Sequence, residues 1–418
     1  MSDSSWRRAV ELTARFVKKP ARLSHLLERL PESMDRGARR RCQYLLYGVV
    51  RNWSFLESRF DSLLSKRPRP GLWSALLVTG FELMQSVENG PKIVDHAVGE
   101  IGRRYSRPER GLANAVLRKA SERMADWKAI VVEDVDSLAM RLSHPRWLVE
   151  RWVEEFGFEP ALSMAEWNGR EPELYALPLR EKGARMGSDS NWSPHRSLSG
   201  CDWKSVQEAL DAGTIYIQNP GARLAPSMLV DRFESGRILD ICAAPGGKSL
   251  FLDARLKERA SEIVALDLPG PRMARLKENI QRFGSERLRA FESDLFEIDP
   301  QELGPFEAIC LDAPCSNTGV MQRKPDAKWR LRAEDFVSLT ELQLRMLRHA
   351  SRFSAPGGWL LYSTCSIDGV ENEGVASRFL DTEEGSAFQL VDAITSLPWK
   401  TGHDGAGARL FRRRPVAS

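Results

Sequence analysis

The sequence predicts a multidomain protein with an all-α N-terminal domain, a small mixed α/β subdomain, and an α/β domain built on an open, mostly parallel sheet. The chain has 418 residues, well above the roughly 100 to 200 residues of a usual single domain. Residues 1–130 show only the three- and four-residue apolar spacing of helices, and β-rich runs alternate with helical segments from Arg237 onward. We therefore expect domains over 1–130, 131–225 and 226–418.

Composition excludes several classes of protein. Hydrophobic residues make up 42% and charged residues 28% of the chain, which is typical of folded globular proteins and not of disordered or fibrous ones. The sequence contains no apolar run long enough for a membrane helix and no signal-peptide core at its start. The six cysteines form no C-x-x-C pair, and the histidines form no H-E-x-x-H motif. We expect a cytoplasmic protein with no membrane segment and no metal site.

Charge is distributed unevenly along the chain. Residues 1–130 carry 25 Lys and Arg against 14 Asp and Glu, a net charge of +11, whereas residues 131–418 carry 36 against 43, a net charge of −7. A basic domain in front of a mildly acidic one indicates that the first domain meets a polyanion, of which nucleic acid is the leading candidate.

The expected elements follow in order. Helical segments such as RRAVELTARFVKK fill the first domain, with turn-forming clusters at 66–71 and 88–91. Residues 131–225 mix a helix (RWLVERWVEEFG) with strand candidates (ELYALPLR and TIYIQNP). The third domain supplies the strands ILDICAA, EIVALDL, LRAFESD, FEAICLD and GGWLLYSTCS with helices between them. Ligands of such sheets bind at the carboxyl ends of the strands.

The loop after the first of these strands is a candidate cofactor site. Its small residues let backbone N–H groups approach a ligand at the start of a helix. A phosphate-binding P-loop is excluded because Cys242 occupies the position of its first glycine, and the dinucleotide motif G-x-G-x-x-G is absent. A nucleoside-type cofactor remains, and Asp267, 20 residues after Gly247, would hold its ribose hydroxyls. The predicted cofactor residues are Cys242, Ala243, Ala244, Pro245, Gly246, Gly247, Lys248, Asp267, Asp294 and Asp312.

Two cysteines are candidate nucleophiles. Cys315 and Cys365 each follow a strand of the sheet and precede a polar segment, so they should lie at its ligand-binding edge. The alternative is a buried structural thiol, which is the better interpretation for the other four cysteines. A nucleophilic thiolate needs a nearby cation, and Lys248 is a candidate.

These motifs resemble a known family. LDICAAPGGKS, LDAPCSNTGVMQRKPDAKW and LYSTCSIDGVENE are similar to segments of the bacterial RNA cytosine methyltransferases called RsmB, Sun or Fmu. The resemblance covers nearly the whole chain and implies a Rossmann-like catalytic domain that uses S-adenosylmethionine to make 5-methylcytosine. It also implies a NusB-like N-terminal domain, which points to 16S rRNA, unassembled or partly assembled, as the substrate.

The resemblance further implies roles for individual residues. Cys365 would be the nucleophile and Cys315 would assist release of the enzyme from the product, while Asp312 and Lys248 would act beside the reacting groups. A basic loop with an aromatic residue is suited to phosphate contact and base stacking, although such a loop can also be a plain solvated surface. The predicted RNA-contacting residues of this loop are Arg323, Lys324, Lys328 and Trp329.

The sequence also departs from the family pattern. Asn317 stands where a glycine is usual, Gly369 replaces a proline, Asn219 replaces an aspartate, and Ala406-Gly407 replaces two phenylalanines. Two alternatives stay open at this point: the same reaction on tRNA or another rRNA site, and a non-catalytic RNA-binding factor of ribosome assembly.

Overall fold

The computed structural model describes residues 4–415, which form two compact units. The first contains the residues up to Arg170 together with Met321–Ala333, and the second contains Glu171–Val320 and the residues from Glu334 on. The segment predicted as one subdomain, 131–225, is thus divided between the two units. Its helical part belongs to the first unit because it is tied to it by contacts such as the hydrogen bond from the Ser54 backbone N–H to the Ser143 hydroxyl at 3.0 Å.

The first unit is helical, as predicted. The spacing of Trp6, Val10 and Phe16 gives its first helix a buried face. Pro70 and Pro91 lie in the first turns of two helices, where a proline costs no hydrogen bond. Its helices are α1 (Ser4–Lys18), α2 (Leu23–Leu27), α3 (Arg36–Arg51), α4 (Trp53–Asp61), α5 (Pro70–Gln85), α6 (Gly90–Gly102), α7 (Arg107–Lys128), α8 (Val135–Arg141), α9 (Arg146–Phe156), α10 (Phe158–Gly169) and α16 (Ala327–Arg330). Its likeness to NusB stays a prediction.

The second unit holds two sheets. The smaller one is antiparallel, with strand order β2-β3-β1-β4. Its strands are β1 (Tyr175–Pro178), β2 (Ser188–Asp189), β3 (Arg196–Ser197) and β4 (Ile215–Ile217), with α11 (Trp203–Asp211) before the last of them. The strand candidates predicted around residues 175 and 215 are therefore confirmed.

The larger sheet has the order β10-β11-β9-β8-β5-β6-β7. Strands β5 to β9 are parallel, and β10 and β11 add an antiparallel edge. The strands are β5 (Gly236–Ile241), β6 (Ala260–Asp267), β7 (Leu288–Glu292), β8 (Phe306–Asp312), β9 (Ser354–Thr364), β10 (Phe388–Ser396) and β11 (Ala406–Arg413). This is the Rossmann-like arrangement that the alternation of strands and helices predicts.

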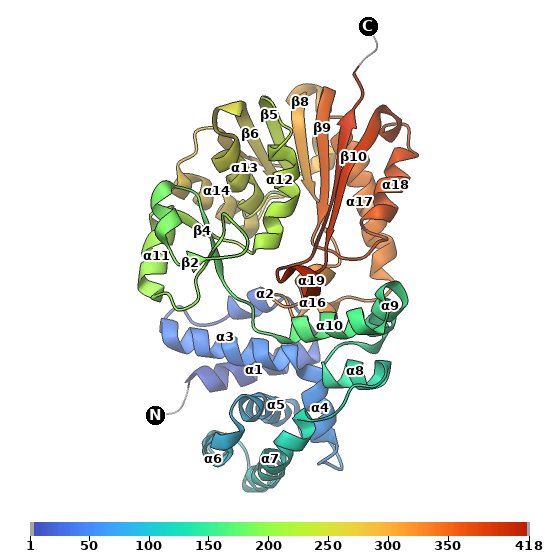
Figure 1. Cartoon of the computed structure of the whole chain (residues 1–418). Helices are drawn as coiled ribbons and strands as arrows, with labels where there is room; N and C mark the ends of the chain where they lie inside the picture. Colours follow the sequence, from blue (N-terminus) through green and yellow to red (C-terminus); the bar gives the residue numbers. More distant parts are fainter. Residues whose placement is uncertain (1–3, 416–418) are drawn as a thin grey trace. The chain divides into compact units, whose positions relative to one another are not determined.

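Helices cover both faces of the larger sheet (Figure 1). α12, α13 and α14 pack on one face, and α17 and α18 pack on the other. Because both faces are buried, the central strands are apolar at consecutive positions such as Ile238 and Leu239. The helices of this unit not yet given are α12 (Leu224–Val230), α13 (Gly247–Leu256), α14 (Pro271–Phe283), α15 (Pro300–Leu303), α17 (Asp335–Ser351), α18 (Glu373–Leu380) and α19 (Pro398–Thr401).

The strand order determines where the site lies. β5 pairs with β6 on one side and with β8 on the other, and the chain order reverses between β5 and β8. Asp312, the last residue of β8, lies opposite Ser363 of β9. The loops after β5, β8 and β9 therefore leave the sheet side by side, at the point where sheets of this kind bind ligands.

No helix within residues 4–415 is long and apolar enough to span a membrane.

Candidate active site

The loop after β5 is built around a bend that carries a carboxylate beside it. Cys242 and Gly246 have positive φ angles of 61° and 107°, which turn the chain sharply between β5 and α13. The Asp267 side chain, at the end of β6, accepts hydrogen bonds from the Ala244 N–H at 2.9 Å and the Leu268 N–H at 2.8 Å. A loop of small residues with a carboxylate at the next strand end suits a nucleoside with free ribose hydroxyls.

A second carboxylate, in the strand before this loop, bonds to the helix after it. Asp240 in β5 is fully buried and accepts a hydrogen bond from the Ser249 hydroxyl at 2.5 Å. Burial raises the pKa of Asp240 to about 7. This contact joins the strand before the loop to the first turn of α13 after it, so it holds both ends of the loop.

Lys248 and Asp312 form an ion pair at the mouth of the site. The ammonium of Lys248 lies 2.6 Å from the Asp312 carboxylate, which also accepts a hydrogen bond from the Ser363 hydroxyl at 3.1 Å. Burial acts against the charged amine, but Asp312 more than compensates and raises the pKa of Lys248. Lys248 is therefore a fixed positive charge.

The two predicted nucleophiles meet in the structure. The sulfur atoms of Cys315 and Cys365 are 3.2 Å apart, and both residues are partly exposed. The hydrogen bond with Cys365, together with burial, raises the pKa of Cys315 well above its ordinary value. Their separation of 50 residues in the chain is closed because β8 and β9 are adjacent parallel strands.

Asn317 lies against both cysteines. Its amide nitrogen donates to the backbone carbonyl of Cys315 at 2.8 Å, and its amide oxygen lies 3.4 Å from the sulfur of Cys365. Its φ angle is 64°, a left-handed conformation that asparagine adopts more readily than most residues. The departure from glycine noted in the sequence thus places a polar side chain at the thiol pair.

A buried carboxylate joins the two cysteine loops. Glu371, in the loop after β9, accepts hydrogen bonds from the Ser316 N–H at 3.0 Å, the Ser316 hydroxyl at 2.5 Å and the Gln343 amide at 2.8 Å. Gln343 also donates to the carbonyl of Pro314 at 2.8 Å. Glu371 is 0% exposed, and burial raises its pKa. The residues on both sides of Cys315 are thereby tied to the loop that follows Cys365.

A second set of buried contacts shapes the Cys365 loop itself. Thr318 donates to the Asp368 carboxylate at 2.6 Å and accepts from the Ile367 N–H at 3.1 Å. The Asn372 amide donates to the carbonyls of Ser366 and Asp368, both at 3.1 Å. Because these buried groups are hydrogen-bonded to one another, the network can hold both loops rigidly.

The sequence analysis missed this network. Its members are Ser316, Thr318, Gln343, Ser366, Asp368, Glu371 and Asn372, which are all buried. The available signal was the polar segment that follows each of the two cysteines, which accounts for these residues except Gln343 of α17. Polar loop residues become buried when two such loops fold against each other, and that pairing is a property of the sheet order.

The predicted RNA-contacting loop is only partly available for RNA. Lys328 is 1% exposed and donates to the carbonyl of Arg51 at 3.0 Å, and the Trp329 indole N–H donates to the carbonyl of Val50 at 2.8 Å. Trp329 also packs edge-to-face on Trp53. These two residues anchor the segment 321–333 in the helical unit. The buried ammonium of Lys328 is engaged within the protein, which speaks against its predicted RNA contact, whereas Trp329 is partly exposed and its predicted role stays a prediction. Arg323 is partly exposed and Lys324 is exposed, and their predicted role stays a prediction.

We expect Lys328→Met to bind RNA with wild-type affinity and salt dependence. Burial and then the charge of Arg51 lower the pKa of Lys328 well below the ordinary 10.5. Lys328 is therefore protonated more readily in the unfolded chain than in the folded chain. Lowering the pH below 10.5 then favours the unfolded chain and destabilises the wild type. The variant should gain about 1 kcal/mol in unfolding free energy at pH 7, and this gain should shrink as pH rises toward 10.

Lys324→Gln is the matched control for that experiment. Loss of one phosphate contact should reduce the slope of log affinity against log salt by about one. A reduced salt slope for Lys328→Met, measured by filter binding, would restore Lys328 as an RNA contact.

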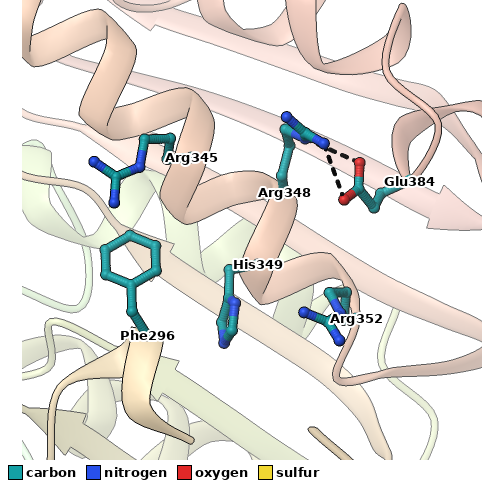
Figure 2. Close-up of a pocket in the computed structure, with 6 residues that line it drawn as sticks. All are labelled: Phe296, Arg345, Arg348, His349, Arg352 and Glu384. Atoms are coloured by element: carbon teal, nitrogen blue, oxygen red, sulfur yellow. Dashed lines mark hydrogen bonds and ion pairs between the residues drawn. The ribbon is translucent and has the colours of Figure 1, made fainter. Parts of the chain in front are cut away.

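A hollow on α17 contains none of the predicted site residues. Figure 2 shows that it is lined by basic side chains from α17, with the bidentate ion pair of Arg348 and Glu384 on one side. Phe296 lies beneath Arg345, whose guanidinium is 5.0 Å from the ring centre.

Within residues 4–415 we find no group of three or more His, Cys, Asp or Glu side chains that could hold a metal ion.

The fold and the strand-end site define the class of Rossmann-like methyltransferases, which use S-adenosylmethionine as methyl donor. The crystal structure of PH0851 has the same fold, with a TM-score of 0.76 and 21% identity over 99% of each chain. Residues 227–406 match the protein family described as 16S rRNA methyltransferase RsmB/F.

Relatives of known name extend the match along the chain. A probable ribosomal RNA small subunit methyltransferase B of Bacillus subtilis (strain 168) is 30% identical over 354 residues, or 80% of this chain and 78% of the relative. The ribosomal RNA small subunit methyltransferase B of Pseudomonas syringae pv. tomato is 30% identical over 377 residues, or 85% of this chain and 81% of the relative. The chain belongs to this methyltransferase B family.

Proposed function

We propose that this protein transfers a methyl group from S-adenosylmethionine to carbon 5 of a cytosine in small-subunit (16S) rRNA through a covalent adduct with Cys365. The observation that carries the proposal is the pair of sulfur atoms 3.2 Å apart, beside a cofactor loop at the switch point of the sheet. The names of the relatives, which specify small-subunit rRNA, support the choice of RNA.

The cofactor site would consist of the loop 242–248 with the strand-end carboxylates Asp267 and Asp294. Asp267 is 7% exposed and already accepts hydrogen bonds along the loop, so a small shift would let it accept from ribose hydroxyls. The bound cofactor supplies a methyl group on a positively charged sulfur.

Each of the two cysteines would carry out one step of the reaction on cytosine. Carbon 5 is a poor nucleophile, so the sulfur of Cys365 first bonds to carbon 6 and makes carbon 5 electron-rich. After methylation, Cys315 assists removal of the proton from carbon 5, and the bond between carbon 6 and Cys365 then breaks to restore the ring. Because the two sulfur atoms are in contact, Cys365 can bond to carbon 6 and Cys315 can reach the proton on carbon 5 without movement of the backbone.

Lys248 and Asp312 would act at the same place. Asp312 is at the end of β8, three residues before Cys315, and its carboxylate can accept a hydrogen bond from the amino group of cytosine. Lys248 would hold the Asp312 carboxylate in place through their 2.6 Å contact. The target base has to be unpaired or flipped out to reach the thiols, which favours free or partly assembled rRNA as substrate.

The test is transfer of labelled methyl from S-adenosylmethionine to unmodified 16S rRNA, with unmodified tRNA in parallel and the labelled base mapped. We expect label on one rRNA cytosine as 5-methylcytosine. Label on tRNA alone would overturn the choice of RNA and keep the chemistry. Label on another atom would overturn the chemistry, and absence of label on both RNAs would favour the non-catalytic assembly factor.

We also expect Asp267→Ala to weaken S-adenosylmethionine binding by about tenfold or more, because hydrogen bonds to a charged group contribute about 1.5 to 3 kcal/mol. Titration calorimetry without RNA measures this directly. Glu292→Ala is the matched control, since Glu292 lies opposite Asp267 in the sheet but is exposed. Equal affinity of Asp267→Ala and wild type would remove Asp267 from the cofactor site.

A further inference from the structure

The orientation of the Asn317 side chain identifies where a proton lies in the thiol pair. The Asn317 amide has one face that donates and one that accepts hydrogen bonds. Its partner at 2.8 Å is the backbone carbonyl of Cys315, which can only accept. The NH₂ group must therefore face Cys315, and the amide oxygen faces the sulfur of Cys365 at 3.4 Å.

An amide oxygen beside a sulfur atom is favourable only if the sulfur carries a hydrogen. A thiolate at this distance would meet the partial negative charge of the oxygen, whereas a thiol can donate to it. The S–H of Cys315 can in turn donate to the sulfur of Cys365 at 3.2 Å. The contacts then form a ring from Cys315 to Cys365, from Cys365 to Asn317, and from Asn317 back to Cys315.

We propose that Asn317 is a catalytic residue that holds Cys365 as a neutral thiol in the substrate-free enzyme. The catalytic meaning of this assignment rests on the proposed function, because Cys365 has to become a thiolate to add to cytosine. Lys248 lies close enough to Cys365 for their charges to interact, but the Asp312 carboxylate at 2.6 Å offsets its charge. The nucleophile is thus kept unreactive at rest, which also restrains two adjacent thiols from oxidation, since disulfide formation requires a thiolate.

The backbone at this position allows a clean test. Asn317 has a φ of 64°, where glycine fits without strain, so Asn317→Gly removes the amide and leaves the loop conformation favourable. Asn317→Asp keeps the shape and an accepting oxygen but adds negative charge, which should hold the proton on Cys365 more tightly. The other titratable groups around Cys365 are unchanged in both variants: Cys315, Asp312, Lys248, Asp368 and Glu371.

The experiment is alkylation of the substrate-free, full-length enzyme by iodoacetamide between about pH 6 and pH 9, with the Cys365 peptide followed by mass spectrometry. For Asn317→Gly we expect the midpoint of the rate profile to move to lower pH and the rate near pH 7.5 to rise about threefold. For Asn317→Asp we expect the midpoint to move to higher pH. Easier access alone would raise the plateau rate at high pH without moving the midpoint.

Midpoints that stay at the wild-type pH in both variants, or that move in the same direction, would overturn the proposal. The measurement needs neither RNA nor cofactor. It therefore fails or succeeds independently of the methyl-transfer test of the proposed function.

Discussion

Replacement of Cys365 by alanine is expected to abolish methyl transfer, whereas replacement of Cys315 by alanine is expected to leave the enzyme covalently attached to its RNA. The first variant lacks the sulfur that bonds to carbon 6, so neither an adduct nor a methylated product can form. The second variant retains this sulfur but lacks the group that assists proton removal. The adduct should therefore accumulate.

A denaturing gel of enzyme mixed with rRNA and S-adenosylmethionine measures both outcomes, since a covalent complex survives denaturation. The double variant Cys315→Ala with Cys365→Ala is the control and should give no adduct. Cys310→Ala serves as a second control, because Cys310 lies in β8, the strand before Cys315, and is buried at 2% exposure. Normal turnover by the Cys365 variant would contradict the assignment, and an adduct from that variant alone would exchange the roles of the two cysteines.

The sequence allowed prediction of the fold class, the parallel sheet and the strand-end position of both thiols. Continuous apolar runs such as Ala308 to Leu311 identify strands buried on both faces, and polar residues after them identify the edge where ligands bind. This information is local in the chain. It required no knowledge of which strands are neighbours.

The division of the chain after Arg170 and the environment of Lys328 could not be predicted in this way. Residues 321–333 leave the β8 loop and pack within the helical unit, so a basic and aromatic segment that looks exposed is anchored by Arg51 and Val50. Contacts between segments more than 270 residues apart leave no periodic trace. The same holds for Asn317, whose role follows from one amide orientation and one backbone angle.

The second large effect is expected at Glu371, which touches neither thiol. Glu371→Ala should lower the free energy of unfolding by about 3 to 5 kcal/mol, because three hydrogen bonds that end on its carboxylate are lost at once. The Ser316 N–H, the Ser316 hydroxyl and the Gln343 amide would each lose their bond to this carboxylate in a buried site. Chemical denaturation of the variant and the wild type measures this loss.

Activity should fall further than the loss of folded protein explains. Ser316 directly follows Cys315, so release of its backbone from Glu371 lets the Cys315 sulfur move away from its 3.2 Å contact with Cys365. A displacement of about 1 Å at a reacting group can cost about 100-fold in rate. Methyl transfer should be measured well below the unfolding midpoint of the variant, and the adduct should accumulate as it does for Cys315→Ala.

Two matched variants separate position from charge at Glu371. Glu371→Gln keeps the volume and one accepting oxygen but turns an NH₂ group toward donors, so its losses should fall between those of the wild type and of Glu371→Ala. Glu341→Ala removes a carboxylate that is 56% exposed and paired with Arg378, and it should change stability by less than about 1 kcal/mol. If Glu371→Ala loses stability but transfers methyl groups at the wild-type rate without adduct accumulation, the buried carboxylate supports the fold and does not position Cys315.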